Sequence, residues 1–469
     1  MSRIFSALLL LTPLIVQAAS DLPAQVQSAL NYRDVPDAAL SIYVEEVDSG
    51  EVVLSWNDAE PRNPASVEKM VTTLVALDVL GPAYRWKTEV TFLGDIRDGV
   101  LDGDIAIKGF GDPYLVTERF WQLLRDIRRE GVSGIDGDLL LDDSFFDVGD
   151  YDPAAFDREP LRAYNVSPNA LLTNFKVVRY YFEPDSDAAG VNVRLEPTLD
   201  NLNIVNRLRV SNGSCRGYQR GITITPNEDV SRITFSGRFP SGCEIYAMDR
   251  TALSHNEFTY GLFRSLWEEI GGDLSGEWKK TIVDADLEPA LVFYSLPLSE
   301  VIAKVNKHSN NVMAKQLLYT LAAEKIGPAG TEAKGRQVVN DWLKDRKMDF
   351  AELKLGNGAG LSRSSRMTAK HLGAMLRYAF ESPYMPEYMS SLSLSGLDGT
   401  LSRRFRNSDL TGQAHMKTGS LDHVSSVAGY FQSRNGKRYI VVTFLNHTDI
   451  HRGPGQEVQE ALLRWLYDQ

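Results

Sequence analysis

Short runs in which apolar and polar residues alternate predict β-hairpins at both ends of the chain. Near the N-terminus, residues 40–47 and 52–56 are strand-like and are separated by a turn sequence that contains glycine. Near the C-terminus, residues 427–432 and 438–445 flank an Asn-Gly pair at 435–436, which is a strong signal for a two-residue turn. We expect strands from both ends of the chain to share one sheet.

Apolar residues at helical spacing predict a helix beside each hairpin. Pro61 and Pro64 interrupt the chain, and an apolar stripe over residues 70–80 then predicts a helix that Ser66 can start. After a Gly-Pro-Gly sequence, residues 458–466 predict an amphipathic helix in the last part of the sequence.

Residues 88–290 differ from both ends, because they contain many short alternating runs and frequent turn signals such as Asp-Gly. One clear helix, from about Thr117 to Glu130, interrupts these runs. We therefore predict a strand-rich insertion, built as one unit or as two nested units. It would divide a single domain formed by residues 20–87 and 291–469.

Residues 1–19 are typical of a secretory signal peptide. Arg3 supplies a positive charge, the run from Ile4 to Val16 is almost wholly apolar, and small residues follow. Because this run is too short to cross a bilayer comfortably, we expect cleavage between Ala18 and Ser20. The chain would then be exported to the periplasm or another extracytoplasmic space, and the alternative is an uncleaved N-terminal anchor.

Composition indicates an ordinary globular protein and narrows its partners. Of the 469 residues, 43% are hydrophobic and 24% are charged, and the formal net charge is −12. This acidic balance argues against binding to a phosphate backbone, so we expect no nucleic-acid partner.

The few cysteines and histidines favour a disulfide over a metal site. Cys215 and Cys243 are the only two cysteines, and in an exported chain such a pair is more often a disulfide than two free thiols. The seven histidines are scattered, and although His447 and His451 are four residues apart, a Gly-Pro pair follows and disfavours a helix there. We expect no metal and no cofactor.

Ser66 and Lys69 form an S-x-x-K pattern at the start of the first predicted helix. Residues three apart lie on one helix face, so the lysine amine can contact the hydroxyl. A serine needs a nearby base to act as a nucleophile, and a lysine can be that base when burial or a neighbouring cation lowers its pKa. Taken alone, the pattern favours an N-cap serine with a solvated lysine, since serine is a preferred N-cap residue.

Ser309 and Asn311 form a second pattern, S-x-N, ahead of another helical stretch. Ser309 could relay a proton between Lys69 and a leaving group, and Asn311 could hydrogen-bond a substrate amide. Taken alone, this pattern also favours helix capping.

A third pattern, K-T-G, occupies residues 417–419, and we place it just before a strand. Lys417 and Thr418 could hold a substrate carboxylate, and Gly419 leaves room for a ligand against the backbone. The N–H of Ser420 could pair with the N–H of Ser66 to stabilise a developing oxyanion. A plain turn is the alternative.

In this order the three patterns are the signature set of penicillin-binding proteins and class A β-lactamases. The chain resembles the class C low-molecular-mass penicillin-binding proteins, the D-alanyl-D-alanine carboxypeptidase/endopeptidase family. Pro64-Ala65 ahead of Ser66, residues 357–363 (NGAGLSR) and the long gap between Lys69 and Ser309 carry this resemblance.

The resemblance implies an α/β (α+β) fold in which a mainly antiparallel, transpeptidase-like sheet is flanked by helices. It also implies a serine DD-peptidase that cleaves D-Ala-D-Ala or peptide cross-links through an acyl-enzyme, with Ser66, Lys69 and Ser309 as catalytic residues. Peptidoglycan stem peptides would be its substrates and β-lactam antibiotics would acylate it. A β-lactamase-like hydrolase and a non-catalytic binder of wall peptide are the alternatives, and a peripheral association with membrane or wall stays open.

This sequence departs from the family pattern at three positions near the motifs. Ala359 replaces the usual Ser of the glycine-rich segment, and Asn310 stands where Asp is common. Lys315 stands where an acidic residue is frequent, which would change the local electrostatics.

Overall fold

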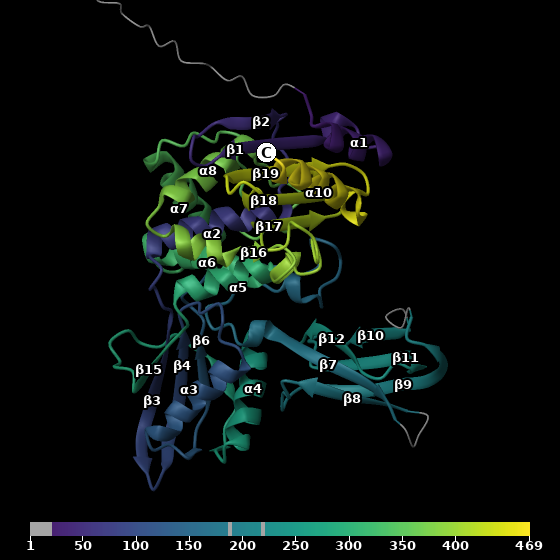
Figure 1. Ribbon diagram of the computed structural model, residues 1–469. Helices are drawn as coiled ribbons and strands as arrows, with labels where there is room; N and C mark the ends of the chain where they lie inside the picture. Colours follow the sequence, from purple (N-terminus) through teal and green to yellow (C-terminus); the bar gives the residue numbers. More distant parts are fainter. Residues whose placement is uncertain (1–20, 186–189, 217–220) are drawn as a thin grey trace, which may run out of the picture.

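The structure is a computed structural model, and it describes residues 21–185, 190–216 and 221–469. Strands from both ends of the chain lie in an upper body, and the middle of the chain forms two lower lobes (Figure 1). The predicted signal peptide lies outside the described residues.

A six-stranded antiparallel sheet is the centre of the upper body. In this sheet β1 pairs with β19 over its whole length, from Leu40 opposite Leu445 to Glu46 opposite Tyr439. The sheet predicted to be shared by both chain ends is therefore confirmed. In spatial order its strands are β16 (Ser393–Leu394), β17 (Ala414–Leu421), β18 (Val424–Gln432), β19 (Arg438–Asn446), β1 (Leu40–Glu46) and β2 (Val52–Trp56).

Helices cover both faces of this sheet, because its central strands are apolar on both sides. Val441 packs in a core with the first and last helices, whereas its neighbour Val442 packs in a second core with the helices on the opposite face. The helices of the upper body are α1 (Ala24–Tyr32), α2 (Lys69–Leu80), α5 (Leu298–His308), α6 (Asn311–Lys325), α7 (Glu332–Asp345), α8 (Ala369–Glu381), α9 (Met385–Ser391) and α10 (Pro454–Tyr467). Short 3-10 helices are η1 (Asp37–Ala39), η2 (Ala65–Glu68), η3 (Ala163–Asn165), η4 (Asn174–Lys176), η6 (Gly399–Leu401) and η7 (Ile450–Arg452).

The first lower lobe is a seven-stranded sheet with two helices packed on it. Its strands are β3 (Lys87–Arg97), β4 (Val100–Gly109), β5 (Gly134–Ile135), β6 (Leu139–Asp142), β13 (Asp273–Leu274), β14 (Trp278–Lys280) and β15 (Leu291–Tyr294). The helices are α3 (Thr117–Arg129), which matches the predicted helix, and α4 (His255–Glu269), which the sequence analysis missed.

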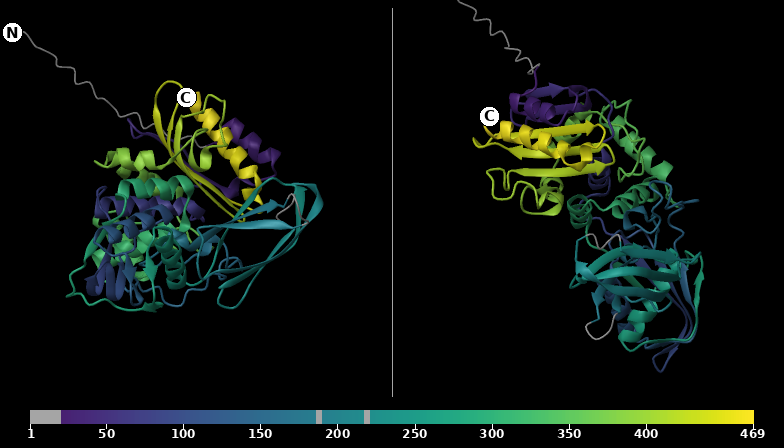
Figure 2. Two further views of the ribbon diagram at one scale, coloured as in Figure 1. Left: turned by 90° about the horizontal axis from the view of Figure 1, so that it is seen from below. Right: turned by 90° about the vertical axis from the view of Figure 1, so that its right-hand side faces the viewer.

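The second lower lobe consists of two three-stranded sheets that project to one side of the body, as Figure 1 and the left view in Figure 2 show. They contain β7 (Val177–Pro184), β8 (Val191–Glu196) and β12 (Tyr246–Thr251), and β9 (Asn203–Ser214), β10 (Ile222–Pro226) and β11 (Arg232–Gly242). The disulfide predicted between Cys215 and Cys243 is present in this lobe, with Cα atoms 4.7 Å apart. We propose residues 88–290 as the inserted region, since they build most of a separate hydrophobic core.

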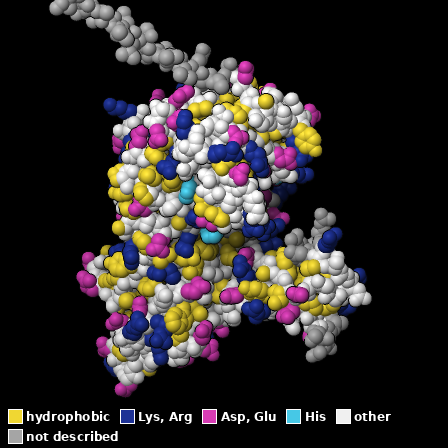
Figure 3. All heavy atoms as spheres, viewed as in Figure 1, with side chains coloured by type: hydrophobic (Ala, Val, Ile, Leu, Met, Phe, Trp, Pro, Cys, Tyr) yellow, Lys and Arg dark blue, Asp and Glu magenta, His cyan; other side chains and the backbone are white. Residues whose placement is uncertain are grey.

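Within the described residues, no helix is long and apolar enough to cross a membrane. Acidic and basic side chains are interspersed over the face shown in Figure 3.

Candidate active site

Ser66 and Lys69 lie where a 3-10 turn becomes a long buried helix. Ser66 is inside η2 and Lys69 is the first residue of α2, and the N-cap positions belong to Pro64 and Glu68. The N-cap interpretation of Ser66 is therefore wrong. Lys69 Nζ lies 3.0 Å from Ser66 Oγ, so the contact predicted from the spacing is confirmed.

The amine of Lys69 has two further oxygen partners. Its Nζ donates to Asn311 Oδ1 at 2.6 Å and to the carbonyl oxygen of Ala359. In the charged form the amine donates to all three oxygens, whereas in the neutral form its two N–H donors would serve Asn311 and Ala359 and its lone pair would be left for the Ser66 hydroxyl. Burial lowers the pKa of Lys69 well below its ordinary value, and the nearby charges of Lys417 and Lys315 lower it further.

Glu68 is a buried carboxyl group near Ser66 that the sequence analysis did not single out. Its side chain accepts the backbone N–H groups of Gly356 and Gly360 at 3.3 and 3.2 Å. A Cβ at Gly360 would lie 1.9 Å from the carbonyl oxygen of Ala65, so only glycine allows this close approach. Glu68 thereby holds the glycine-rich segment, including Ala359, against the start of α2.

The three residues of the second motif, Ser309 to Asn311, have different structural roles. Asn310 is the N-cap of α6 and its side chain accepts the N–H of Met313 at 3.0 Å. The N-cap interpretation is thus right for Asn310, whereas Ser309 is the C-cap of α5 and Asn311 is the first residue of α6. Ser309 has a left-handed backbone (φ 54°) that ends α5, and Asn311 accepts from Lys69.

The third motif lies within a strand, not before one as predicted. β17 spans Ala414–Leu421, and its neighbour β16 pairs only with His415 and Met416, so the strand edge is uncovered from Lys417 onward. Lys417 Nζ donates to Ser309 Oγ at 2.8 Å. Burial lowers the pKa of Lys417 to about 7.

The edge of β17 lies directly against Ser66. A Cβ at Gly419 would lie 2.5 Å from the carbonyl oxygen of Pro64 and 3.1 Å from the amide nitrogen of Ser66. Thr418 Oγ1 donates to Thr400 Oγ1 at 2.8 Å, which adds a hydroxyl that sequence reasoning missed. Ser420 is exposed directly after Gly419, and its oxyanion role stays a prediction.

The site opens onto a groove of about 670 Å³ between the upper body and the lower lobes. Ser309 and Asn311 belong to its wall, so the groove is continuous with the reactive residues. The opposite wall comes from α3, η3, η4 and strands β7, β8 and β12. It includes the aromatic residues Tyr164, Phe175 and Tyr181 and the paired Arg179 and Asp249.

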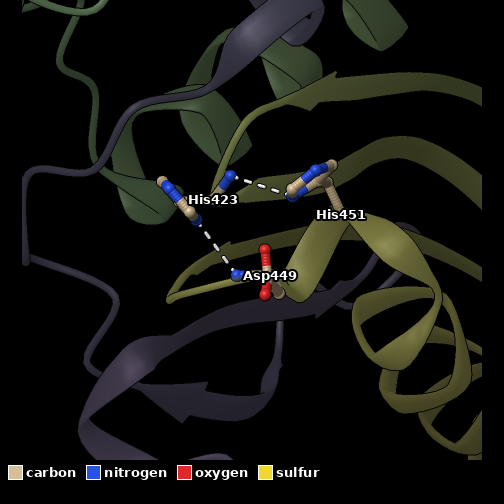
Figure 4. A group of neighbouring side chains, drawn as sticks. All are labelled: His423, Asp449 and His451. Carbon is tan, nitrogen blue, oxygen red and sulfur yellow. Dashed lines mark hydrogen bonds between the residues drawn. The ribbon is translucent and has the colours of Figure 1, made fainter.

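A second group of polar residues, His423, Asp449 and His451, has potential ligand atoms within 4.8 Å of one another (Figure 4). Nδ1 of His423 accepts the N–H of Asp449, and Nδ1 of His451 accepts the N–H of His423, both at 3.0 Å. A metal at either Nε2 would require a proton on these Nδ1 atoms, which face backbone donors. The two rings therefore fix the turn after β17, and we assign no metal to them; His447 is not part of the group.

The fold and the site together fit a serine acyl-transferring enzyme that carries an S-x-x-K motif. The D-Ala-D-Ala carboxypeptidase 3 (S13) family matches residues 22–469, and the chain belongs to this family. It is a serine-type D-Ala-D-Ala peptidase of the low-molecular-mass penicillin-binding class that acts on peptidoglycan, as the resemblance implied. Because this family acts on the cell wall, the protein works outside the cytoplasm.

Relatives and solved structures agree with this assignment. The chain is 27% identical to the D-alanyl-D-alanine carboxypeptidase of Actinomadura sp. (strain R39) over 463 residues, which cover 94% of this chain and 84% of the relative. The crystal structure of penicillin-binding protein 4 from Haemophilus influenzae superposes with a TM-score of 0.80 at 20% identity and covers 95% of this chain and 99% of that one. A predatory endopeptidase of Bdellovibrio bacteriovorus acylated by penicillin G superposes with a TM-score of 0.54 at 17% identity, over 91% and 90% of the two chains. The last two likenesses concern the fold.

Proposed function

We propose that Ser66 is the nucleophile of the peptidase reaction and that Lys69 is its general base. The observation that carries this proposal is the set of contacts around Lys69 Nζ, whose two acceptors leave its lone pair for the Ser66 hydroxyl. As Ser66 Oγ bonds to the carbonyl carbon of the penultimate D-alanine, its proton passes to Lys69.

The edge of β17 and the second motif orient the substrate. Lys417 and Thr418 pair with the terminal carboxylate, and Asn311 bonds to an amide of the acyl part of the substrate. The carbonyl oxygen turns toward the N–H groups of Ser66 and Ser420, and each such donor contributes about 3–4 kcal/mol in comparable oxyanion holes.

Ser309 completes the proton path to the leaving group. Its hydroxyl donates to the departing amine as the C–N bond breaks, and it is replenished by the proton held on Lys69. Water then attacks the Ser66 ester by the reverse path, which releases the shortened peptide and restores the hydroxyl. Lys417, bonded to Ser309 at 2.8 Å, orients that hydroxyl before the substrate arrives.

A β-lactam presents the same pairing of a carboxylate and an amide carbonyl, so we expect it to acylate Ser66. The penicillin G-acylated relative and the Haemophilus influenzae protein in complex with a β-lactam support this expectation. The groove beside Ser309 has room for a second stem peptide, which supports cleavage of cross-links as well as of terminal D-alanine. We place the mature protein in the periplasm after removal of residues 1–19.

Mass spectrometry of penicillin-treated protein tests the assignment. The wild type should gain one drug mass on the peptide that contains Ser66. Ser66→Ala should lose this adduct. Lys69→Ala should stay folded, as circular dichroism can check, but it should acylate at least 100-fold more slowly. Such a decrease corresponds to a loss of about 3 kcal/mol of transition-state stabilisation. An adduct on another serine, or normal acylation in either variant, would overturn the proposal.

A further inference from the structure

Lys315 is a buried cation that the mechanism above does not use. It lies on α6 one helical turn after Asn311, whose Oδ1 accepts from the base Lys69. Residues four apart on a helix share a face, so Lys315 and Asn311 project to the same side of α6. Only 1% of the Lys315 side chain surface is exposed.

Its polar partners are neutral. Nζ donates to Tyr151 Oη at 2.7 Å and to the carbonyl oxygen of Val166 at 3.0 Å, and it lies 5.1 Å from the centroid of the Tyr151 ring. Among the described residues, no carboxylate lies within ion-pair distance of it. Glu332 on α7 is the acidic group that acts electrostatically on Lys315, and its carboxylate is already paired with Arg336.

A buried charge without a counterion acts on its surroundings over a longer range than a solvated one, because little water screens it. The charged groups that act on Lys69 are Glu68 from η2, Lys417 from β17 and, beyond Asn311 on α6, Lys315. Of these, Glu68 favours the protonated form of Lys69, and the two lysines oppose it.

We propose that Lys315 is a positioning residue for acylation: its buried charge acts through space on the amine of Lys69 and favours the neutral form that accepts the Ser66 proton. This inference rests on the proposed function, because it requires Lys69 to be the base. Burial lowers the pKa of Lys315 to about 8, so Lys315 carries its charge at neutral pH and loses it in alkaline solution. The influence on Lys69 is therefore confined to pH values below about 8.

The pH profile of acylation by a chromogenic penicillin tests this role. In the wild type, acylation falls in acid as Lys69 takes up a proton. Lys315→Met removes the charge at similar volume, and it should move this acid limb upward by roughly one pH unit, since a like charge in a protein interior shifts a pKa by an amount of this order. The profiles of the two proteins should converge above about pH 8, where Lys315 is neutral in the wild type.

Two matched variants separate charge from packing. Lys315→Arg retains the cation and should keep the wild-type limb. Tyr151→Phe removes the hydroxyl that Lys315 bonds but leaves the cation, and it should also keep the limb even if acylation slows.

An unmoved limb in Lys315→Met, or an equal shift in Tyr151→Phe, would overturn the inference and leave Lys315 as a structural link to the loop at Tyr151 and Val166. The adduct on Ser66 is measured in the same samples. Its absence would refute the proposed function itself, whereas an intact adduct with an unmoved limb refutes only the role of Lys315.

Discussion

At the scale of single residues, the reaction centre is built from buried amines whose charge the protein interior disfavours. Lys69 and Lys417 are both inaccessible to solvent, and their nearest partners are hydroxyl, amide and carbonyl oxygens. Removing such a cation from water costs free energy, which lowers the pKa of each amine. The burial that suits Lys69 to the base role proposed above therefore also destabilises the folded protein near neutral pH.

Replacing Lys417 by Met should test both the role of this amine in turnover and the effect of its burial on stability. The variant should turn over a D-Ala-D-Ala peptide about 100-fold or more slowly, since it loses ~3 kcal/mol of carboxylate recognition in a desolvated site. A steady-state assay measures this, and normal turnover would refute the role of Lys417.

The stability of the same variant should depend less on pH. The pKa of Lys417 is about 7 in the folded protein and 10.5 for an ordinary lysine, so between these values the unfolded chain binds the additional proton. Wild-type stability therefore rises with pH across this window, by up to ~1.4 kcal/mol per pH unit for this one group. Urea unfolding at pH 7 and pH 9 should show a smaller rise for Lys417→Met, and equal rises in both proteins would contradict it.

Gly419 should be intolerant of even a methyl group. Because its Cβ would lie 2.5 Å from the Pro64 carbonyl oxygen, Gly419→Ala must push β17 away from the start of the nucleophile turn. We expect acylation to fall by about 100-fold, the cost of a small displacement between reacting groups. In the control Gly134→Ala the nearest atom to the new Cβ would be at 3.5 Å, and acylation should stay normal.

Most of the reactive residues were identifiable from the sequence because their order and spacing match a known signature. Ser66, Lys69, Ser309, Asn311 and Lys417 meet in one site, as predicted. Glu68 escaped notice, because its function depends on backbone N–H groups almost three hundred residues away in the chain. No local pattern marks such a partner.

At the scale of elements, the helix N-cap within the second motif links stability to catalysis. Asn310→Ala removes the acceptor of the Met313 N–H and should cost about 1 kcal/mol, or roughly 2–4 °C in melting temperature. Acylation should fall as well, because Ser309 and Asn311 flank the cap. Asn310→Asp keeps the acceptor and adds a charge that the helix N-terminus favours, so it should melt at or above the wild-type temperature. Equal melting of the Ala variant and the wild type by calorimetry would contradict the capping role.

Strands and helices were predictable where local pattern agrees with tertiary environment. The two hairpins of the shared sheet were found to within a few residues, since their turns and alternation are strong. Helix α4 was missed although Ser254 and Glu257 form a capping box at its start, because its aromatic residues are typical of strands and its glycine disfavours a helix. Asp102-Gly103 reads as a turn but lies inside β4, where Gly103 packs against the backbone of Leu93.

At the scale of the whole molecule, the insertion and the upper body each contain a large hydrophobic core, and two small mixed clusters on α6 join them beside the groove. The disulfide lies in the second lower lobe, where Cys215 and Cys243 directly follow β9 and β11. Its two ends are 28 residues apart, so it should stabilise that lobe by about 3–4 kcal/mol through the entropy of the unfolded chain.

The double variant Cys215→Ser, Cys243→Ser should therefore lose stability locally. Hydrogen exchange should accelerate in β9 and β11, while acylation of Ser66 by penicillin should stay within about twofold of the wild type, because the reactive residues lie in another core. Free-thiol titration of the unreduced, denatured wild type should find none, and two thiols would exclude the disulfide. Loss of acylation together with the faster exchange would show that the lobe and the active site unfold as one unit, and the independence of the two cores would then be wrong.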